Sequence, residues 1–260
     1  MTPILLVKGI SRRFGGYLAL NDVSCDFVAG QIHALIGPNG AGKTTLFNVI
    51  SGALRPTAGQ VVFEGMVYTG RRPDSVLRMG IARNFQQVRL VRSLSVVENV
   101  MIGCHARIDR GLLGNSAEFF GIGGAEGAAR TKAREMLDFV GMSAKLHMQP
   151  DELTLVDQRR LEIARALASE PRLLLLDEPA AGMNHAELDE LSALIKRIKQ
   201  LGMTILLVEH HIRLIMAIAD NITVLSAGSV IANGPPSVIQ LDPTVIAAYL
   251  GQRDEPALSP

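Results

Sequence analysis

A glycine-rich segment directly before a lysine and a threonine carries the clearest chemistry in this sequence. Residues 37–44 read G-P-N-G-A-G-K-T and fit the pattern G-x-x-x-x-G-K-[ST]. Glycines let backbone N–H groups turn inward on phosphate oxygens, and a helix that begins there adds the positive end of its dipole. We predict a phosphate-binding loop made by Gly37, Pro38, Asn39, Gly40, Ala41, Gly42, Lys43, Thr44 and Thr45. The alternative, a simple glycine-rich turn, does not account for a Lys-Thr pair at a helix start.

Two residues of this loop have specific roles in the pattern. Lys43 is expected to reach the β- and γ-phosphates of a nucleotide, and Thr44 to ligate Mg²⁺. The apolar run before the loop, residues 32–36, predicts a strand, and residues 44–50 predict the helix that follows. This strand, loop and helix order is the context that the motif requires.

A second acidic motif follows a run of four leucines. Leu173 to Leu176 show no alternation, which predicts a strand buried on both faces, and Asp177-Glu178 come directly after it. Acids at the end of a buried strand need a charge partner. A nucleotide-bound Mg²⁺ would supply one, with Asp177 binding or orienting the metal and Glu178 polarising the attacking water. The alternative is an ordinary acid pair in solvent.

Three further positions are weaker candidates for contacts with a nucleotide. Phe14 or Tyr17 could stack on adenine, although ordinary packing is the better explanation of either aromatic taken alone. Gln86 and His210 each follow a predicted strand, where ligands bind in open α/β sheets. His210 could contact a γ-phosphate, and an incidental histidine is the alternative.

Composition restricts the class of protein. The 260 residues suffice for one large α/β domain with or without an inserted subdomain, and the net charge of +1 gives no indication of nucleic-acid binding. The two cysteines, at 25 and 104, form no metal pattern and are expected to be reduced and structural. No apolar run is long enough to cross a bilayer. We expect a soluble, cytosolic protein that reaches a membrane only through a partner.

The pattern of elements predicts three parts. They are an α/β nucleotide-binding core over 1–87 and 156–240, a helical subdomain over 88–155, and a C-terminal helix and tail over 241–260. The core is expected to start with antiparallel strands. Its predicted features are strands at 4–7 and 23–28, a turn at 11–17, a helix at 157–168, an Asn184–Glu187 cap and a hairpin at 222–232. The subdomain is expected to have helices at 96–104 and 127–140 and a loop at 111–124, and the tail at 253–260 is expected to be mobile.

Taken in this order, the motifs resemble the ATP-binding cassette of ABC transporters over nearly the whole chain. The resemblance implies an α/β P-loop NTPase fold with an antiparallel β subdomain and an inserted helical subdomain, and it implies ATP and Mg²⁺ as cofactors. Lys43, Glu178 and His210 match the catalytic positions. Thr44, Gln86 and Asp177 match the metal-binding positions, with Gln86 also linking to the membrane partner. Phe14, rather than Tyr17, matches the adenine-stacking position.

The chain is similar in particular to the ATPase subunits of branched-chain amino acid importers. The segments that carry this similarity are residues 81–86, 160–167, 208–210 and 242–251. It implies a second ATP-binding cassette in a homo- or heterodimer, integral-membrane permease subunits, and indirectly a periplasmic or lipid-anchored substrate-binding protein. It implies no nucleic-acid partner and a place at the cytoplasmic face of the inner membrane.

Two segments depart from the family pattern. Residues 153–157 read L-T-L-V-D where the family signature is L-S-G-G-Q, so that Leu155 and Val156 replace glycines and Asp157 adds a negative charge. Residues 181–184 read A-G-M-N where S-A-L-D is usual. Both segments serve the nucleotide of the opposite subunit in the family. Two alternatives therefore stay open: a soluble ABC-type ATPase without a membrane partner, and a regulatory cassette with weak hydrolysis.

Overall fold

The computed structural model describes residues 2–84, 90–108 and 122–250, and it divides the chain into two compact units. The first unit combines residues 1–72 with 198–260, and the second comprises residues 73–197. The three-part division expected from the sequence stays a prediction. The expected mobile tail at 253–260 lies outside the described residues.

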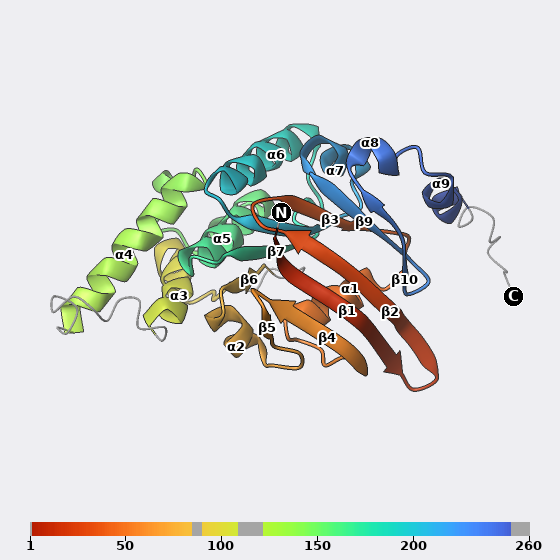
Figure 1. Ribbon diagram of the computed structural model, residues 1–260. Coiled ribbons are helices and arrows are strands. Elements are labelled where there is room, and N and C mark those ends of the chain that lie inside the picture. Colours follow the sequence, from red (N-terminus) through yellow and green to blue (C-terminus); the bar gives the residue numbers. More distant parts are fainter. Residues whose placement is uncertain (1, 85–89, 109–121, 251–260) are drawn as a thin grey trace, which may run out of the picture. The chain divides into compact units, whose positions relative to one another are not determined.

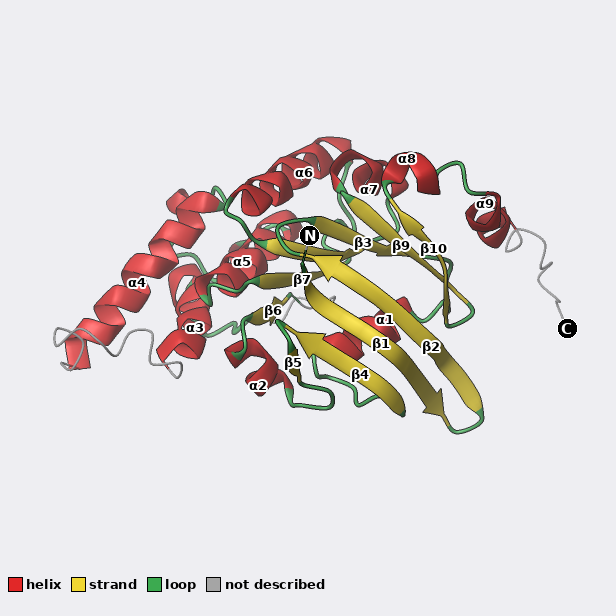
Figure 2. Cartoon of the chain, in the orientation of Figure 1, coloured by secondary structure: helices red, strands yellow, loops and turns green. Residues whose placement is uncertain are grey.

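The first unit contains a four-stranded antiparallel sheet with the order β2-β1-β4-β5 (Figures 1 and 2). Its strands are β1 (Pro3–Phe14), β2 (Tyr17–Val28), β4 (Ala58–Phe63) and β5 (Met66–Val67). The predicted turn at 11–17 is wrong for most of its length. Arg12, Arg13 and Phe14 pair with β2, so only residues 15–16 turn the chain. Ladder pairing across the hairpin, with its register shifts, outweighs the local polar composition.

The same unit holds the strand that leads into the phosphate-binding loop. β3 (Ile32–Ile36) lies between two parallel neighbours, β8 (Thr204–Val208) and β9 (Asn221–Ser226). The predicted final hairpin is present, since β10 (Ser229–Gly234) pairs antiparallel with β9. Every residue of β3 and β8 is buried, as the continuous apolar runs predicted. The helices of this unit include α1 (Lys43–Ile50), α7 (Ile212–Ile218), α8 (Pro236–Ile239) and α9 (Pro243–Leu250).

The second unit pairs two parallel strands with several helices. β6 (Ile81–Arg83) and β7 (Leu173–Asp177) are adjacent and parallel. The α-helices are α2 (Pro73–Arg78), α3 (Val96–Ile108), α4 (Ile122–Phe139), α5 (Leu155–Ala168) and α6 (His185–Gln200), and two short 3-10 helices are η2 (Ser143–Lys145) and η3 (Pro150–Glu152). None of the helices in the described part of the chain has both the length and the apolar character needed to cross a bilayer.

Local sequence signals account for some helix ends in this unit but not for others. The predicted cap of α6 is confirmed, because Asn184 N–H donates to the Glu187 carboxylate at 2.8 Å and Glu187 N–H donates to the Asn184 side chain at 3.1 Å. The predicted loop at 111–124 is wrong at its end. α4 already begins at Ile122, because neighbouring helices support a segment whose glycines disfavour a helix. Residues 111–121 lie outside the described residues.

A close crossing of α3 and α5 depends on one glycine. A Cβ atom at Gly103 would lie 2.1 Å from the backbone oxygen of Arg165. No real side chain tolerates that distance, so the two helices approach each other only because residue 103 has none. Gly127 on α4 is the opposite case, since a Cβ there would meet no atom within 4 Å.

Gly103→Ala should therefore destabilise the chain by about 1–3 kcal/mol, because the helices must separate to admit the methyl group. Gly127→Ala is the matched control and should raise the free energy of unfolding by about 0.5–1 kcal/mol, since alanine favours an exposed helix position. Urea unfolding followed by circular dichroism measures both. Equal stability of the two variants would contradict the close crossing.

Candidate nucleotide-binding and signature segments

The phosphate-binding loop in the first unit has the backbone that its glycines predicted. Gly42 caps α1 with a φ of 99°, and a Cβ atom there would lie 2.7 Å from the backbone oxygen of Ala19. Lys43 begins the helix, and its Nζ donates to the carbonyl oxygens of Gly37 at 2.6 Å and Pro38 at 2.8 Å. The ammonium group is thus held over the loop. Together with the N–H groups of the first helical turn, which lack intrahelical acceptors, it suits an anion with several oxygens.

Phe14 lies at the end of the β1–β2 hairpin in the first unit. Its ring is 45% exposed, and the Arg12 guanidinium carbon lies 4.5 Å from the ring centroid. Tyr17, across the turn, is 62% exposed. Neither ring is buried in the core. Stacking of Phe14 on a base therefore stays a prediction, and the exposure of the ring permits it.

His210 follows β8, and a buried carboxylate fixes the turn that presents it. Glu209 is 1% exposed, and its Oε2 accepts the backbone N–H groups of His210 at 3.0 Å and His211 at 3.3 Å. The same oxygen lies 2.9 Å from His211 Nδ1. The two imidazole rings are 4.5 Å apart between centroids. The supporting role of Glu209 escaped the sequence analysis, because only its place at the end of a buried strand signalled it.

Asp177 ends β7 in the second unit and is 1% exposed. The charge partner expected for it is a nucleotide-bound Mg²⁺; in the structure Arg83 is a partner as well, with Nη2 2.8 Å from Asp177 Oδ2. The Asp177 N–H donates to Asn84 Oδ1 at 2.7 Å. Burial raises the pKa of the Asp177 carboxyl, while Arg83 acts in the opposite direction. Arg83 was missed because its role follows from the pairing of β6 with β7, which no local pattern specifies.

Glu178, the next residue, has a positive φ of 46° and is half-buried. Such backbone is uncommon for a residue with a side chain and is concentrated at functional sites. The third acceptor expected near the metal, Gln86, lies outside the described residues. The three residues predicted to hold the metal, Thr44, Asp177 and Gln86, all carry oxygen donors, which is the type that Mg²⁺ prefers.

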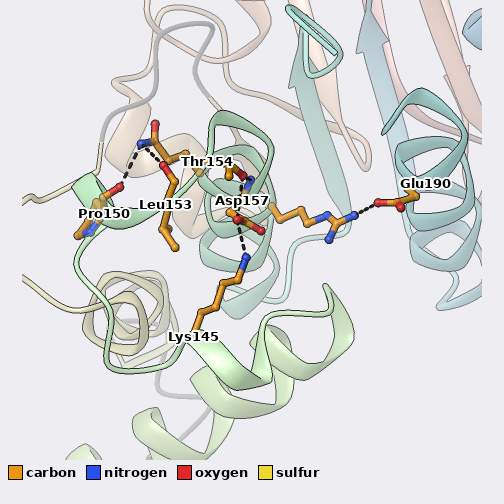
Figure 3. A network of polar contacts seen from close by, with 8 residues as sticks. Lys145, Pro150, Leu153, Thr154, Asp157 and Glu190 are labelled. Atoms are coloured by element: carbon orange, nitrogen blue, oxygen red, sulfur yellow. Dashed lines mark hydrogen bonds and ion pairs between the residues drawn. The ribbon is translucent and has the colours of Figure 1, made fainter. Parts of the chain in front are cut away.

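The altered signature segment forms a polar network at the start of α5 (Figure 3). Thr154 caps the helix by accepting the Asp157 N–H at 3.2 Å, and its hydroxyl donates to Asp157 Oδ2 at 2.8 Å. Lys145 Nζ lies 2.5 Å from the same carboxylate oxygen. Gln158 Nε2 donates to the carbonyl oxygens of Pro150 at 3.0 Å and Leu153 at 3.3 Å. The charge that Asp157 adds to the signature is therefore balanced within the second unit.

No comparable contact compensates for the bulk of Leu155 and Val156, which stand where the family signature has glycines. Leu155 is 46% exposed, and a Cβ atom at Gly182 would lie 3.2 Å from Leu155 Cδ2. The Leu155 side chain thus lies close to the Cβ position of Gly182, in the segment after Asp177. Leu155 and Val156 present bulk where glycine would leave backbone accessible to a phosphate.

A cavity of about 320 Å³ lies elsewhere in the second unit. Its walls are mostly apolar, and two arginines and a serine add polar groups; the lining residues are Leu77, Ala82, Arg83, Ile102, Gly103, Arg165, Ala166 and Ser169. Burial lowers the pKa of Arg165, and the neighbouring Glu162 opposes that effect. The cavity is thus an apolar recess with basic groups on its wall.

Comparison with known proteins assigns the family. The family model described as ABC transporter matches residues 20–181, and the model described as branched-chain amino acid ATP-binding cassette transporter matches residues 229–255. The high-affinity branched-chain amino acid transport ATP-binding protein LivG of Escherichia coli K12 is 41% identical over 96% of this chain and 98% of its own. BraF of Pseudomonas aeruginosa, described in the same terms, is 39% identical over the same shares of the two chains.

A solved ATP-binding cassette of an ABC transporter in its ADP conformation has a TM-score of 0.82 and is 29% identical, covering 96% of this chain and all of its own. A nucleotide-free cassette has a TM-score of 0.81 and 28% identity, over 95% and 99% of the two chains. The chain belongs to the ATP-binding cassette family of ABC transporters. The predicted fold and the predicted function class, an ATP-hydrolysing subunit of a transporter of the branched-chain amino acid type, are confirmed. The roles of the individual site residues stay predictions.

The network around Asp157 makes a prediction about pH. Burial alone would raise the pKa of this carboxyl, but hydrogen bonds from Lys145 and Thr154 outweigh the effect of burial and hold the pKa below its ordinary value. Lys145→Met should lower the free energy of unfolding at pH 7 by about 1 kcal/mol, a value reduced because Lys145 is partly exposed. A carboxyl whose pKa is lower in the folded than in the unfolded state stabilises the fold at pH values above its unfolded-state pKa. That stabilisation is lost as the pH falls through the folded-state pKa. The difference in unfolding free energy between Lys145→Met and the wild-type chain should therefore be constant down to about pH 5 and then narrow.

Urea unfolding from pH 7 to pH 4 checks this dependence. Lys132→Met is the control, because it removes a 2.8 Å ion pair with Glu170, whose side chain is 43% exposed. The control should cost less at pH 7. A Lys145→Met deficit that stays unchanged through the acid range would contradict the assigned charge balance.

Proposed function

We propose that this chain binds ATP and Mg²⁺ through its phosphate-binding loop and hydrolyses the ATP to drive an importer for branched-chain or related amino acids. The observation that carries this proposal is the loop itself. Gly42 caps α1 in a conformation that needs glycine, and the Lys43 ammonium lies over the loop within 2.8 Å of two of its carbonyl oxygens. The family assignment and the ADP-bound relative support ATP as the nucleotide.

The proposed roles follow from the chemistry of phosphoryl transfer. Positioning and neutralisation of charge supply most of the rate enhancement in this reaction, and a bound Mg²⁺ would supply part of that neutralisation. Lys43 and the loop N–H groups hold the phosphates, while Thr44, Asp177 and Gln86 hold the metal. Glu178 orients or deprotonates the attacking water. His210, fixed by Glu209, stabilises charge on the γ-phosphate, and Phe14 stacks on adenine.

Glu178→Gln should leave the Kd for ATP within about twofold while lowering turnover by about 100-fold or more, because the amide cannot take a proton from water. Filter binding of labelled ATP and phosphate release, with the chain assembled in its transporter, measure the two quantities. Glu126→Gln on α4, whose side chain is 64% exposed, is the control and should change neither. Full turnover in Glu178→Gln would show that Glu178 neither orients nor deprotonates the attacking water.

Membrane subunits are the proposed partners that convert the ATPase cycle into transport, together with a periplasmic or lipid-anchored substrate-binding protein. This places the chain at the cytoplasmic face of the inner membrane, attached through those subunits. The apolar cavity with Arg83 and Arg165 on its wall supports a recess for a short helical segment that carries an acidic residue.

The second ATPase subunit is proposed to be a different chain. In the family, each signature segment faces the nucleotide of the opposite cassette, and here Leu155 and Val156 obstruct the approach to a phosphate. A partner with glycines at these positions would complete the site at Lys43, while its own site would receive the altered segment. The result is a heterodimer in which one nucleotide site hydrolyses ATP well and the other hydrolyses it weakly. This arrangement is compatible with the alternative in which the chain has a partly regulatory role.

A dimerisation experiment tests this partner choice with the chain alone. Glu178→Gln, which retains ATP, should stay monomeric with ATP and Mg²⁺ in sedimentation velocity. Adding Leu155→Gly and Val156→Gly should restore an ATP-dependent homodimer, because the backbone can then reach the opposite phosphate. Adding Leu241→Gly and Val67→Gly instead, two exposed positions, is the matched control and should not. An ATP-dependent homodimer of Glu178→Gln itself would overturn the proposal.

A further inference from the structure

Three consecutive residues after β8 bring together side chains of the kinds that bind transition metals. Glu209, His210 and His211 each offer one ligand atom, and these atoms all lie within 4.8 Å of one another. In the described part of the chain, no other group of three or more His, Cys, Asp or Glu side chains meets this condition. The mechanism proposed above uses His210 and its support Glu209, whereas His211 has no part in it.

The types of ligand in this cluster select the metal. Two imidazole nitrogens and one carboxylate oxygen are a set that Zn²⁺ binds, in three-ligand sites that leave a fourth position for water. Mg²⁺ instead prefers oxygen ligands alone. The cluster therefore suits Zn²⁺, or a late first-row ion of similar preference, and not the Mg²⁺ that accompanies a nucleotide.

Two of the three ligand atoms already have nearly the spacing that a metal needs. Glu209 Oε2 lies 2.9 Å from His211 Nδ1. Zinc bonds of about 2.0–2.1 Å at tetrahedral angles place two ligand atoms about 3.3 Å apart. An ion bound to both atoms would replace the proton of their hydrogen bond. The His210 ring lies beside the His211 ring, with 4.5 Å between centroids and 31° between planes, so rotation of side chains suffices to close the site.

The backbone that carries the cluster is fixed in the absence of a metal. Every residue of β8 is buried, and Glu209 Oε2 accepts the N–H groups of His210 and His211. The His211 carbonyl oxygen accepts the Ile215 N–H at 3.1 Å at the start of α7, while the His211 side chain makes no capping hydrogen bond and contacts Glu209 instead. Ligands held on such rigid elements bind a metal with little loss of conformational entropy.

Solvent reaches the cluster at its two histidines. His210 is exposed, the His211 side chain is 29% exposed, and the Glu209 side chain is fully buried. An ion from solution therefore has access to both imidazoles, and the buried carboxylate supplies a negative charge where water screens it little.

We propose that Glu209, His210 and His211 form a site for Zn²⁺ or a similar late transition-metal ion, and that occupation of this site inhibits ATP hydrolysis. An imidazole that ligates the ion is withdrawn from the γ-phosphate, which is the position that the proposed mechanism gives to His210. Only the inhibition rests on the proposed function, because the metal site stands on the cluster itself.

The test of binding is His211→Gln, titrated with Zn²⁺ by calorimetry on the full chain without nucleotide. The Kd for Zn²⁺ should rise at least about tenfold, since a lost ligand costs no less than a lost partner of a ligand. His210→Gln, at the exposed position, should have the same effect and gives a second measurement if one variant folds poorly. His147→Gln is the matched control, an exposed histidine of the second unit, and should leave the Kd unchanged. Equal affinity in all of these chains, or displacement of Zn²⁺ by excess Mg²⁺, would overturn the site.

The test of inhibition uses the assembled transporter at controlled concentrations of free Zn²⁺. Zn²⁺ should inhibit ATP hydrolysis by the wild type. His211→Gln should keep the zinc-free turnover while the Zn²⁺ concentration for half-inhibition rises at least about tenfold. The same inhibition in both proteins would overturn the withdrawal of His210. Failure of the wild-type transporter to hydrolyse ATP in zinc-free buffer would instead overturn the proposed function, and the affinities measured without nucleotide would still decide the metal site.

Discussion

Compensation of buried negative charge is the constraint on which the functional segments depend. Four acidic side chains among the described residues are buried: Asp157, Glu162, Asp177 and Glu209. Each has a cation or N–H donors within its own unit, from Lys145, Arg159, Arg83 and the His210–His211 turn respectively. A carboxylate out of water without such a partner would shift its pKa until it became neutral. Each of these buried carboxylates is thus compensated by groups of its own unit.

This constraint explains why the functional side chains lie at the ends of elements. Asp177 and Glu209 end or directly follow buried parallel strands, where the backbone leaves its ladder and nearby N–H groups become available. Lys43 and Asp157 lie in the first turns of helices, where N–H groups also lack intrahelical acceptors. The α/β architecture therefore supplies electrostatic partners at the same positions at which it supplies ligand-binding residues. The positive charge of Lys43 is compensated in the same way, by the carbonyl oxygens of Gly37 and Pro38.

The sequence predicted the features whose physics is local. The glycine-rich loop at 37–44, the buried strands predicted at 32–36 and 173–176 and the Asn184–Glu187 cap each follow from a short run of residues, and each is present. Features set by pairing between distant segments escaped it. Arg83 becomes the partner of Asp177 through the adjacent strands β6 and β7, and Phe14 lies in a strand because β2 continues to pair with it. Periodicity within a segment carries no information about such neighbours.

The signature segment shows how the same constraint separates two kinds of sequence change. Replacing a polar residue by Asp157 introduces a charge, and that change is absorbed because Lys145 and Thr154 lie within hydrogen-bond distance. Replacing glycine by Leu155 introduces volume, and volume is not absorbed, because the side chain stays 46% exposed at the surface. A surface whose charge is already balanced and whose exposed contact is apolar is suited to protein contact rather than to phosphate.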